Sequence, residues 1–249
     1  MRILHLKGEA LDPVLAEGRP SSTDCDVLVD PAQVSAYTSA LTADGREQVT
    51  TFEHGSVFGH AATFHHRVWG TVDVHRAFPG LDHDPAATFE RLWQDRGSVD
   101  LGGAACAVPH LTAQRLVLLV HAARDRSGRA RHDVRVSWTE AEEQERARIE
   151  TLAEQLGGAV PLALATGRPE RAAGLPGAHV WRAVHEGASP STVWRARLQD
   201  ARGPVARVRV LLEALRVNRD HLGLRLGHPP TRREVRREWW ARWGRLLRR

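Results

Sequence analysis

The chain has 249 residues, 42% hydrophobic and 26% charged, a composition typical of a globular protein with one large domain or two smaller ones. It contains no apolar run of about eighteen residues and turns polar too early for a signal peptide, so we expect no membrane-spanning helix and a cytoplasmic location. The only cysteines, Cys25 and Cys106, exclude a disulfide framework or a four-cysteine zinc site.

Charge is divided unevenly along the chain. Residues 1–105 contain 8 Lys and Arg against 15 Asp and Glu, a net charge of −7, and residues 106–249 contain 27 against 15, a net charge of +12. This asymmetry favours two units, one suited to divalent cations and one to a polyanion. Since glycines at 97, 102 and 103 mark a boundary, we predict one domain over residues 1–105 and another over 106–249.

Short strands and helices alternate in the first half. Apolar spacing and turn residues predict, in chain order, a strand over 2–6, a helix over 9–18, a strand over 24–29, a helix over 31–43, two or three strands within 50–54, 57–69 and 71–78 with turns at Gly55 and Gly70, and a helix over 86–95. These elements form a small mixed sheet with helices.

The second half has helical periodicity almost throughout. Helices are predicted over 111–124, 139–156, 159–166, 190–200 and 204–220, and an amphipathic basic helix over 231–249. We therefore predict an α+β fold, in which a small mixed-sheet domain precedes a mainly helical one.

Three carboxylates have the spacing of a metal site. Asp24 and Asp26 lie two residues apart on a predicted strand, so both point to one face with their Cα atoms about 6.6 Å apart. Asp73 alternates with Val72 and Val74 in the same way and joins them if the two strands are neighbours. Oxygen ligands on a rigid sheet suit Mg²⁺ or Mn²⁺, and a pair of such ions can clamp a phosphoryl group during displacement.

Two further features point to a nucleotide. Lys7 and Gly8 precede a predicted helix whose free N–H groups favour a phosphate, and glycine permits close approach. His75 alternates onto the same face as Asp73, where it can orient substrate or a phosphate. Cys25 points to the opposite face, toward the core, and the adjacent His65 and His66 are expected on an exposed hairpin rather than at a shared metal.

The runs LKGEALDPVLAEGRPSSTDCDVLVDP and GTVDVHRAFPG together resemble an uncharacterised nucleotidyltransferase family that is similar to the DNA polymerase β-type superfamily. The resemblance covers residues 3–30 and 69–80, and more loosely 109–125. Gly8-Glu9 departs from the usual Gly-Ser or Gly-Gly, and Arg19 lies about one residue farther from Asp24 than expected.

The resemblance implies a role for each matching residue. Asp24 and Asp26 would hold two metal ions, and Asp73 would complete the site and help to deprotonate the acceptor. Gly8 would lie against the triphosphate, with Lys7 and Arg19 binding phosphates. Members of the family occur near genes for ribosomally made peptide products, which implies a role in peptide natural-product biosynthesis. His121 is expected in the helical core, although the resemblance leaves a substrate role open.

We therefore expect a metal-dependent nucleotidyltransferase that moves a nucleoside monophosphate, AMP in the first instance, from a nucleoside triphosphate to a hydroxyl of a small molecule or peptide. The alternative is a non-catalytic protein of the same fold that binds nucleotide, RNA or peptide.

The helix over 231–249 carries eight Arg and two Glu, with Val235, Trp239, Trp243, Leu246 and Leu247 on one stripe. The stripe is expected to pack on the protein or on a second copy. Contact with a membrane, a partner surface or nucleic acid remains open.

Overall fold

The computed structural model describes residues 1–21, 23–53 and 59–247, with the backbone alone for 242–247. The predicted turn at Gly55 and the side chains of Trp243, Leu246 and Leu247 lie outside this description. Within these ranges, no helix combines the length and the apolar character that crossing a bilayer requires.

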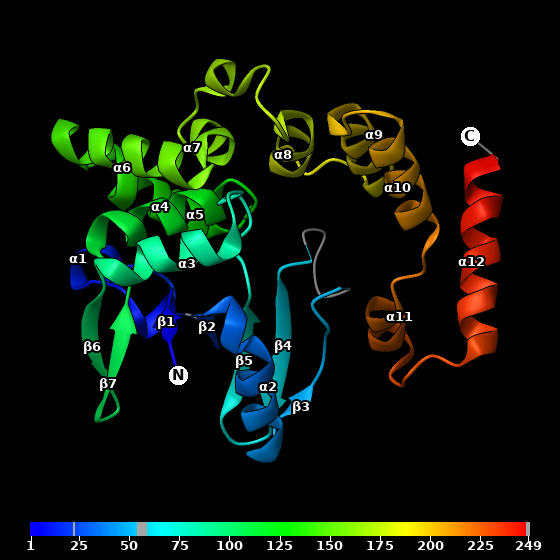
Figure 1. The fold of residues 1–249 in the computed structure, drawn as a ribbon, viewed down its shortest axis with the longest axis horizontal. Coiled ribbons are helices and arrows are strands. Elements are labelled where there is room, and N and C mark those ends of the chain that lie inside the picture. Colours follow the sequence, from blue (N-terminus) through cyan, green and yellow to red (C-terminus); the bar gives the residue numbers. More distant parts are fainter. Residues whose placement is uncertain (22, 54–58, 248–249) are drawn as a thin grey trace.

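A five-stranded mixed sheet forms one layer of the molecule (Figure 1). Its strands, in spatial order, are β1 (Ile3–His5), β2 (Asp24–Val29), β5 (Gly70–His75), β4 (Ala61–His66) and β3 (Glu47–Gln48). The β2–β5 pair is parallel and the others are antiparallel. The predicted mixed sheet is thus confirmed, but the strand expected over 50–54 lies earlier, at β3.

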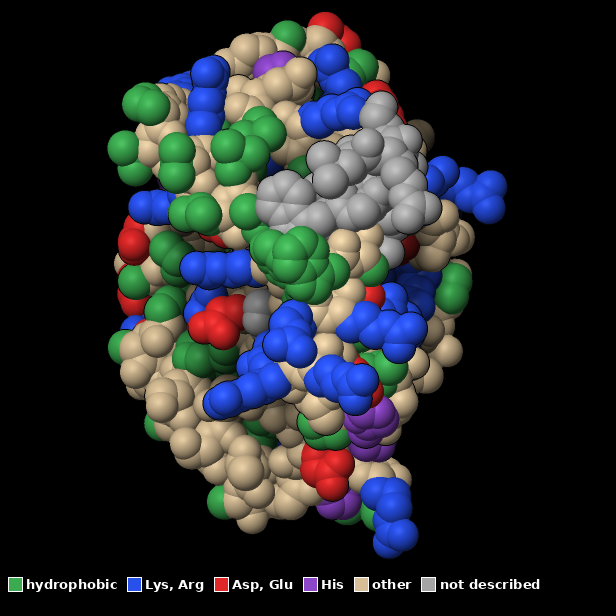
Figure 2. Space-filling model, turned by 90° about the vertical axis from the view of Figure 1, so that its right-hand side faces the viewer, with side chains coloured by type: hydrophobic (Ala, Val, Ile, Leu, Met, Phe, Trp, Pro, Cys, Tyr) green, Lys and Arg blue, Asp and Glu red, His purple; other side chains and the backbone are tan. Residues whose placement is uncertain are grey.

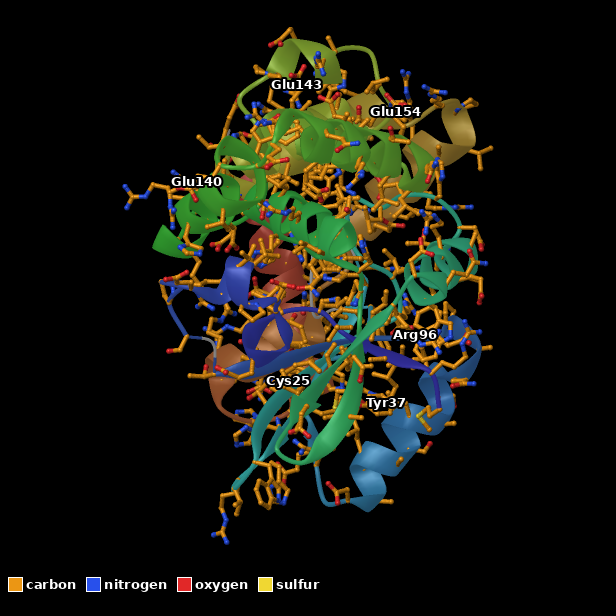
Figure 3. The ribbon with its side chains drawn as sticks, turned by 90° about the vertical axis from the view of Figure 1, so that its left-hand side faces the viewer. Cys25, Tyr37, Arg96, Glu140, Glu143 and Glu154 are labelled. Carbon is orange, nitrogen blue, oxygen red and sulfur yellow. The ribbon has the colours of Figure 1, made fainter. Side chains whose placement is uncertain are left out.

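The two faces of the sheet are buried against different helices. On one face, alternate side chains such as Val27, Val72 and Phe64 pack with Leu41 of α2 (Val34–Ala43). Cys25 belongs to this face, as predicted, and Figure 3 shows it on the sheet near Tyr37 of α2. The opposite face carries Leu28 into a larger core made with the helical layer.

Helix α4 (Leu111–Ala122) lies at the centre of that helical layer and is buried on nearly every side. Around and beyond it follow α3 (Pro85–Gln94), α5 (Gly128–Val134), a π-helical turn (Arg135–Thr139), α6 (Glu143–Leu156), α7 (Ala159–Ala165), a 3₁₀ turn (Pro169–Ala172) and α8 (Ala178–His185). Because α4 contacts α5, α6 and α7, it organises the core that the sheet rests on.

The last helices form an arm that extends from this body (Figure 1). The arm comprises α9 (Pro190–Asp200), α10 (Pro204–Leu215), α11 (Arg219–Leu226) and α12 (Arg232–Leu247). Asp220 of α11 accepts hydrogen bonds from the backbone N–H and the hydroxyl of Thr51, at 2.7 and 2.8 Å. These bonds tie the arm to the segment that follows β3.

A hairpin occupies the region predicted as a domain boundary. Strands β6 (Gly97–Leu101) and β7 (Ala104–Val108) are joined by Gly102 and Gly103, both at positive φ, as two-residue hairpin turns require. The predicted division after residue 105 falls inside β7. One core cluster contains residues from both sides of it, such as Leu28, Phe78, Leu116 and Trp181.

Several predicted helices differ in extent. The helix expected over 9–18 is a 3₁₀ turn (Gly8–Ala10) followed by α1 (Pro13–Ala16). Pro13 disfavours helical backbone at Asp12, which is instead extended and caps α1. A 3₁₀ turn (Pro31–Gln33) precedes α2, and α6 begins at Glu143. The helix expected over 204–220 ends at Leu215 as α10, and the predictions do not include α5, α8 or most of α11.

Candidate functional site

The register of β2 and β5 brings the three predicted carboxylates to one face of the sheet. Asp26 is directly opposite Asp73, and Asp24 is opposite Thr71. Because neighbouring strands lie about 4.8 Å apart and side chains alternate, Asp24, Asp26 and Asp73 project from adjacent positions toward the layer that contains α4. His75, two residues after Asp73, shares this face.

Asp26 is the most constrained of the three. It is 4% exposed, and each carboxylate oxygen has a cationic or hydrogen-bonding partner. Lys7 Nζ lies 3.0 Å from Oδ2, and His75 Nε2 donates to Oδ1 at 2.9 Å. Burial alone would raise the pKa of Asp26, but the hydrogen bond from His75 and the charge of Lys7 outweigh it and hold the pKa well below its usual range.

Asp73 has a different environment. Burial raises its pKa, and the charges of Asp26 and Asp24 add to the rise, against the effect of a hydrogen bond from Thr63 Oγ1 at 2.7 Å. Thr63 lies on β4, opposite Asp73 in the antiparallel register. Of these two neighbouring carboxylates, Asp26 is therefore held ionised and Asp73 has an increased affinity for a proton. Such a pair is suited to metal binding or proton transfer.

Histidines and an arginine line the other side of the cluster. The ring of His60 stacks on that of His75, with centroids 5.2 Å apart. Burial, together with the charges of His75, Arg124 and Lys7, lowers the pKa of His60 to about 2. From the end of α4, His121 has its pKa lowered to about 3 by burial and by the charges of Lys7 and Arg124.

Three buried polar atoms in this region have no hydrogen-bond partner among the described residues. They are His75 Nδ1, His121 Nδ1 and Arg124 Nε. Buried polar groups are nearly always paired, so these atoms are candidate hydrogen-bonding groups for a polar ligand, although His121 Nδ1 also lies 4.0 Å from a carboxylate oxygen of Asp125. Because Lys7 and the Arg124 guanidinium are cationic donors, phosphate oxygens match them chemically.

The predicted phosphate-binding turn differs from the expected geometry. Gly8 has a φ of +68°, which favours glycine, but it opens a three-residue 3₁₀ turn rather than a helix. The expected helix N-terminus is therefore absent at this point. Leu6 N–H donates to the carbonyl of Asp26 at 3.0 Å, which brings Lys7 to the carboxylates.

Arg19 is held away from the role predicted for it. Its Nε and Nη2 donate to both oxygens of Asp133 on α5, at 2.7 and 3.1 Å. The two side chains are 5% and 0% exposed. This bidentate pair joins the loop before β2 to the helical layer, and Arg124 is the arginine that contributes charge at Asp26.

Sequence reasoning missed Arg124, His60 and Thr63. Arg124 follows the apolar run of α4 and resembles a solvent-exposed residue at a helix end. His60 and Thr63 contribute through strand pairing that no local pattern records. His65 and His66 lie on the β4–β5 hairpin, His65 exposed and His66 half-buried, and each has its own hydrogen-bond partner.

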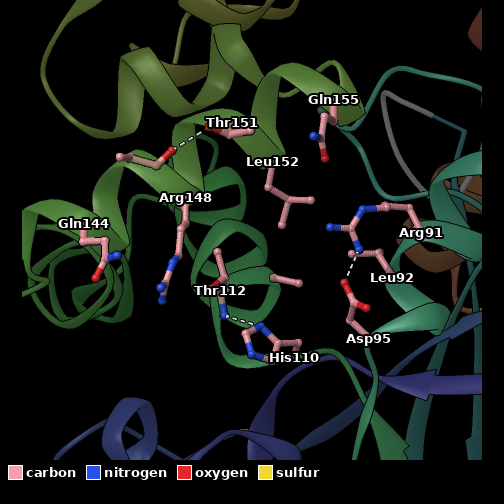
Figure 4. Close-up of a pocket in the computed structure, with 12 residues that line it drawn as sticks. Arg91, Leu92, Asp95, His110, Thr112, Gln144, Arg148, Thr151, Leu152 and Gln155 are labelled. Atoms are coloured by element: carbon pink, nitrogen blue, oxygen red, sulfur yellow. Dashed lines mark hydrogen bonds and ion pairs between the residues drawn. The ribbon is translucent and has the colours of Figure 1, made fainter.

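A cavity lies near the other end of α4, about 14 Å along its axis from His121. This cavity of about 460 Å³ separates α3 from α6 and is shown in Figure 4. Its polar lining includes His110, Arg91, Arg148 and Gln155. Its lining includes none of the carboxylates or their partners, so it is a separate feature of the helical layer.

Comparison with models of known protein families finds no match, and a search of curated proteins also finds none. The geometry of the carboxylate face therefore carries the functional argument.

Proposed function

We propose that the chain is a metal-dependent nucleotidyltransferase that transfers a nucleoside monophosphate, AMP in the first instance, from a triphosphate to a hydroxyl of a small-molecule or peptide acceptor. One observation carries the proposal. The parallel register places Asp26 opposite Asp73, with Asp24 two residues away on the same face. Carboxylates presented in this way beside the cationic groups of Lys7 and Arg124 suit a polyphosphate and its cations.

The cation-binding residues would be Asp24, Asp26 and Asp73. Their oxygen donors suit Mg²⁺ or Mn²⁺, which would neutralise phosphate charge when bound. No three His, Cys, Asp or Glu side chains of the described residues lie close enough together to hold a metal as they stand. Lys7 occupies Oδ2 of Asp26, so a cation can reach that oxygen once the lysine turns to the phosphates.

The reaction requires one bond to form and one to break. The acceptor oxygen bonds to the α-phosphorus, and the bond between that phosphorus and the bridging oxygen breaks, releasing pyrophosphate. The hydroxyl proton passes to Asp73, whose raised pKa suits a proton acceptor. Lys7 and Arg124 would stabilise the phosphate charge, and His75 would orient Asp26.

The second candidate is a non-catalytic protein that binds nucleotide, RNA or peptide on the same fold. The contacts of Asp26 favour this second candidate, because Lys7 and His75 already bind both carboxylate oxygens without a metal ion. The two candidates differ in whether nucleotide binding depends on metal. Thermal unfolding with ATP, measured with and without Mg²⁺, should show metal-linked stabilisation for the transferase and none for the binding protein.

The decisive experiment is incubation with each nucleoside triphosphate, Mg²⁺ and an acceptor mixture, read by mass spectrometry for an added nucleotide. Asp26→Asn and Asp73→Asn should reduce transfer by about 100- to 10,000-fold while the fold is retained. Asp44→Asn is the matched control, since that carboxylate is 66% exposed and lies at the end of α2. Undiminished transfer by either variant would reject the assignment.

A further inference from the structure

Helix α10 presents an apolar stripe to the outside of the molecule. Val205, Val208, Leu211 and Leu212 are 74%, 54%, 51% and 55% exposed. At 100° per residue these side chains fall within one continuous sector of the helix. Four aliphatic side chains more than half exposed on one helix form a surface that water solvates poorly.

The opposite side of α10 is the one that packs on the protein. Ala206, Val210 and Ala214 recur every fourth residue and are half-buried, and α10 contacts α9. Glu213 on this side pairs with Arg197 of α9 at 3.0 Å. The exposed stripe is therefore an additional face of a helix whose inner face is partly covered by the protein.

Arginines border the stripe on both sides. By the helical angle, Arg207 lies about 40° beyond Leu211, and Arg209 lies about 40° beyond Val205 at the other edge. Both arginines are exposed. Long cationic side chains beside an aliphatic sector can keep their guanidinium groups in water while their stems follow the apolar surface.

The rest of the arm is also positively charged. Residues 201–247 contain 12 Arg and 4 Asp or Glu. Each acidic residue has a partner within the protein, namely Arg197 for Glu213, Thr51 for Asp220, Thr231 for Glu234 and Arg225 for Glu238. Figure 2 shows apolar and basic side chains interspersed over the side that carries the arm.

Helix α12 carries an exposed aromatic side chain in addition to exposed arginines. Trp240 is 64% exposed and meets Trp239 edge to face at 4.9 Å. Arg232, Arg233 and Arg236 on the same helix are exposed. Tryptophan, arginine and aliphatic side chains together match the boundary between lipid headgroups and acyl chains.

We propose that α10 lies in the surface of an anionic lipid bilayer, with Val205, Val208 and Leu212 inserted among the acyl chains and the surrounding arginines against acidic headgroups. A second copy of the chain matches this surface less well, because its arginines would meet arginines. Nucleic acid would pair with the arginines but would leave the aliphatic stripe in water.

The test is co-sedimentation of the full chain with vesicles of phosphatidylcholine and phosphatidylserine in a two-to-one ratio, compared with phosphatidylcholine alone. The unaltered chain should sediment with the anionic vesicles only. The double variant Val208→Glu, Leu212→Glu should weaken that binding at least about tenfold, because it places charge in the apolar sector. Both sites are exposed, and circular dichroism will verify the fold.

Two control variants test whether vesicle binding requires the α10 stripe itself and whether it requires the arginines beside the stripe. Val68→Glu with Trp69→Glu changes two residues that are 69% and 74% exposed on the β4–β5 hairpin, and should leave vesicle binding unchanged. Arg207→Gln with Arg209→Gln should weaken binding to anionic vesicles several-fold, and raised salt should do the same.

Three results would overturn the proposal. The first is absence of the unaltered chain from the anionic vesicle pellet. The second is a concentration-dependent dimer that the α10 double variant abolishes, which would assign the stripe to a second copy. The third is binding to a labelled single-stranded RNA without vesicle binding, which would assign the arginines to nucleic acid.

Discussion

The body and the C-terminal arm use charge in opposite ways. In the body, the acidic side chains of Asp26 and Asp133 are almost fully buried, and each is held by a cationic partner. In the arm, every arginine of residues 201–241 is exposed, and over residues 201–247 arginines outnumber acidic residues threefold. Interior charge positions groups relative to one another, whereas surface charge is available to an external anion.

Most of the positive charge in the second half of the sequence lies in the arm. Residues 201–249 contain 14 Arg and 4 acidic residues, a net charge of +10, out of the +12 for residues 106–249. Residues 106–200 therefore carry 13 basic against 11 acidic residues, a net charge of +2. The basic unit is the arm rather than the whole second half.

Removing one arginine from each region should give the largest contrast. Arg19→Met leaves Asp133 buried without its partner and should lower the free energy of unfolding by about 3–5 kcal/mol. Arg225→Met in the arm removes an arginine that is 63% exposed and should cost less than about 1 kcal/mol. Urea denaturation measures both.

The buried pair has an internal control. Arg19→Met combined with Asp133→Leu removes both charges and should recover most of the stability lost by the single variant. Equal losses for Arg19→Met and Arg225→Met would show that the two regions do not differ in this respect.

Glycine substitutions should give the next largest contrast. A Cβ at Gly80, where φ is +89°, would lie 2.7 Å from both Trp181 and Val120. Gly80→Ala should therefore cost about 3 kcal/mol from crowding and backbone strain. Gly227 of the arm has a similar φ of +74° but no atom within 4 Å of its Cβ position, so Gly227→Ala should cost about 1 kcal/mol. Thermal unfolding that shows equal losses would contradict this packing argument.

The smallest expected effect concerns pH. His60 and His121 have folded-state pKa values lowered to about 2 and about 3, so below pH 6.5 the unfolded chain binds protons that the folded chain does not. The contribution of each histidine to the free energy of unfolding should be fully present above pH 6.5. It should decrease as the pH falls, by about 2 kcal/mol for each histidine at pH 5. His60→Phe should flatten this dependence in denaturation series from pH 7 to 5. An unchanged slope in that variant would show that His60 does not contribute.

Local pattern predicted much of the sheet and of the central helix. The patterns DCDVLV and TVDVH predict β2 and β5 correctly, because the carboxylates share one face while alternate valines pack into the core on the other. The helical spacing of Leu111, Leu116, Val117, Leu119 and Val120 predicts α4 correctly, because these side chains pack into the core. The paired glycines at 102 and 103 did contain the signal of a hairpin, but they were interpreted as a boundary.

Other features depended on pairing between distant segments. The register that puts Asp26 opposite Asp73 follows from how β2 and β5 associate, and alternation alone does not determine it. The family resemblance implies that Arg19 binds phosphate, but α5 supplies a buried partner, Asp133, that the local sequence does not reveal. For α10, periodicity indicated a helix and not which side would be covered by α9.

The contact between Lys7 and Asp26 has a practical consequence, because Lys7 is the only lysine in the chain. Protein grown with ¹⁵N-lysine would give a single side-chain ammonium resonance, and that resonance would originate at the carboxylate cluster. The sequence thus supplies a spectroscopic reporter on its own candidate site, with no substitution needed.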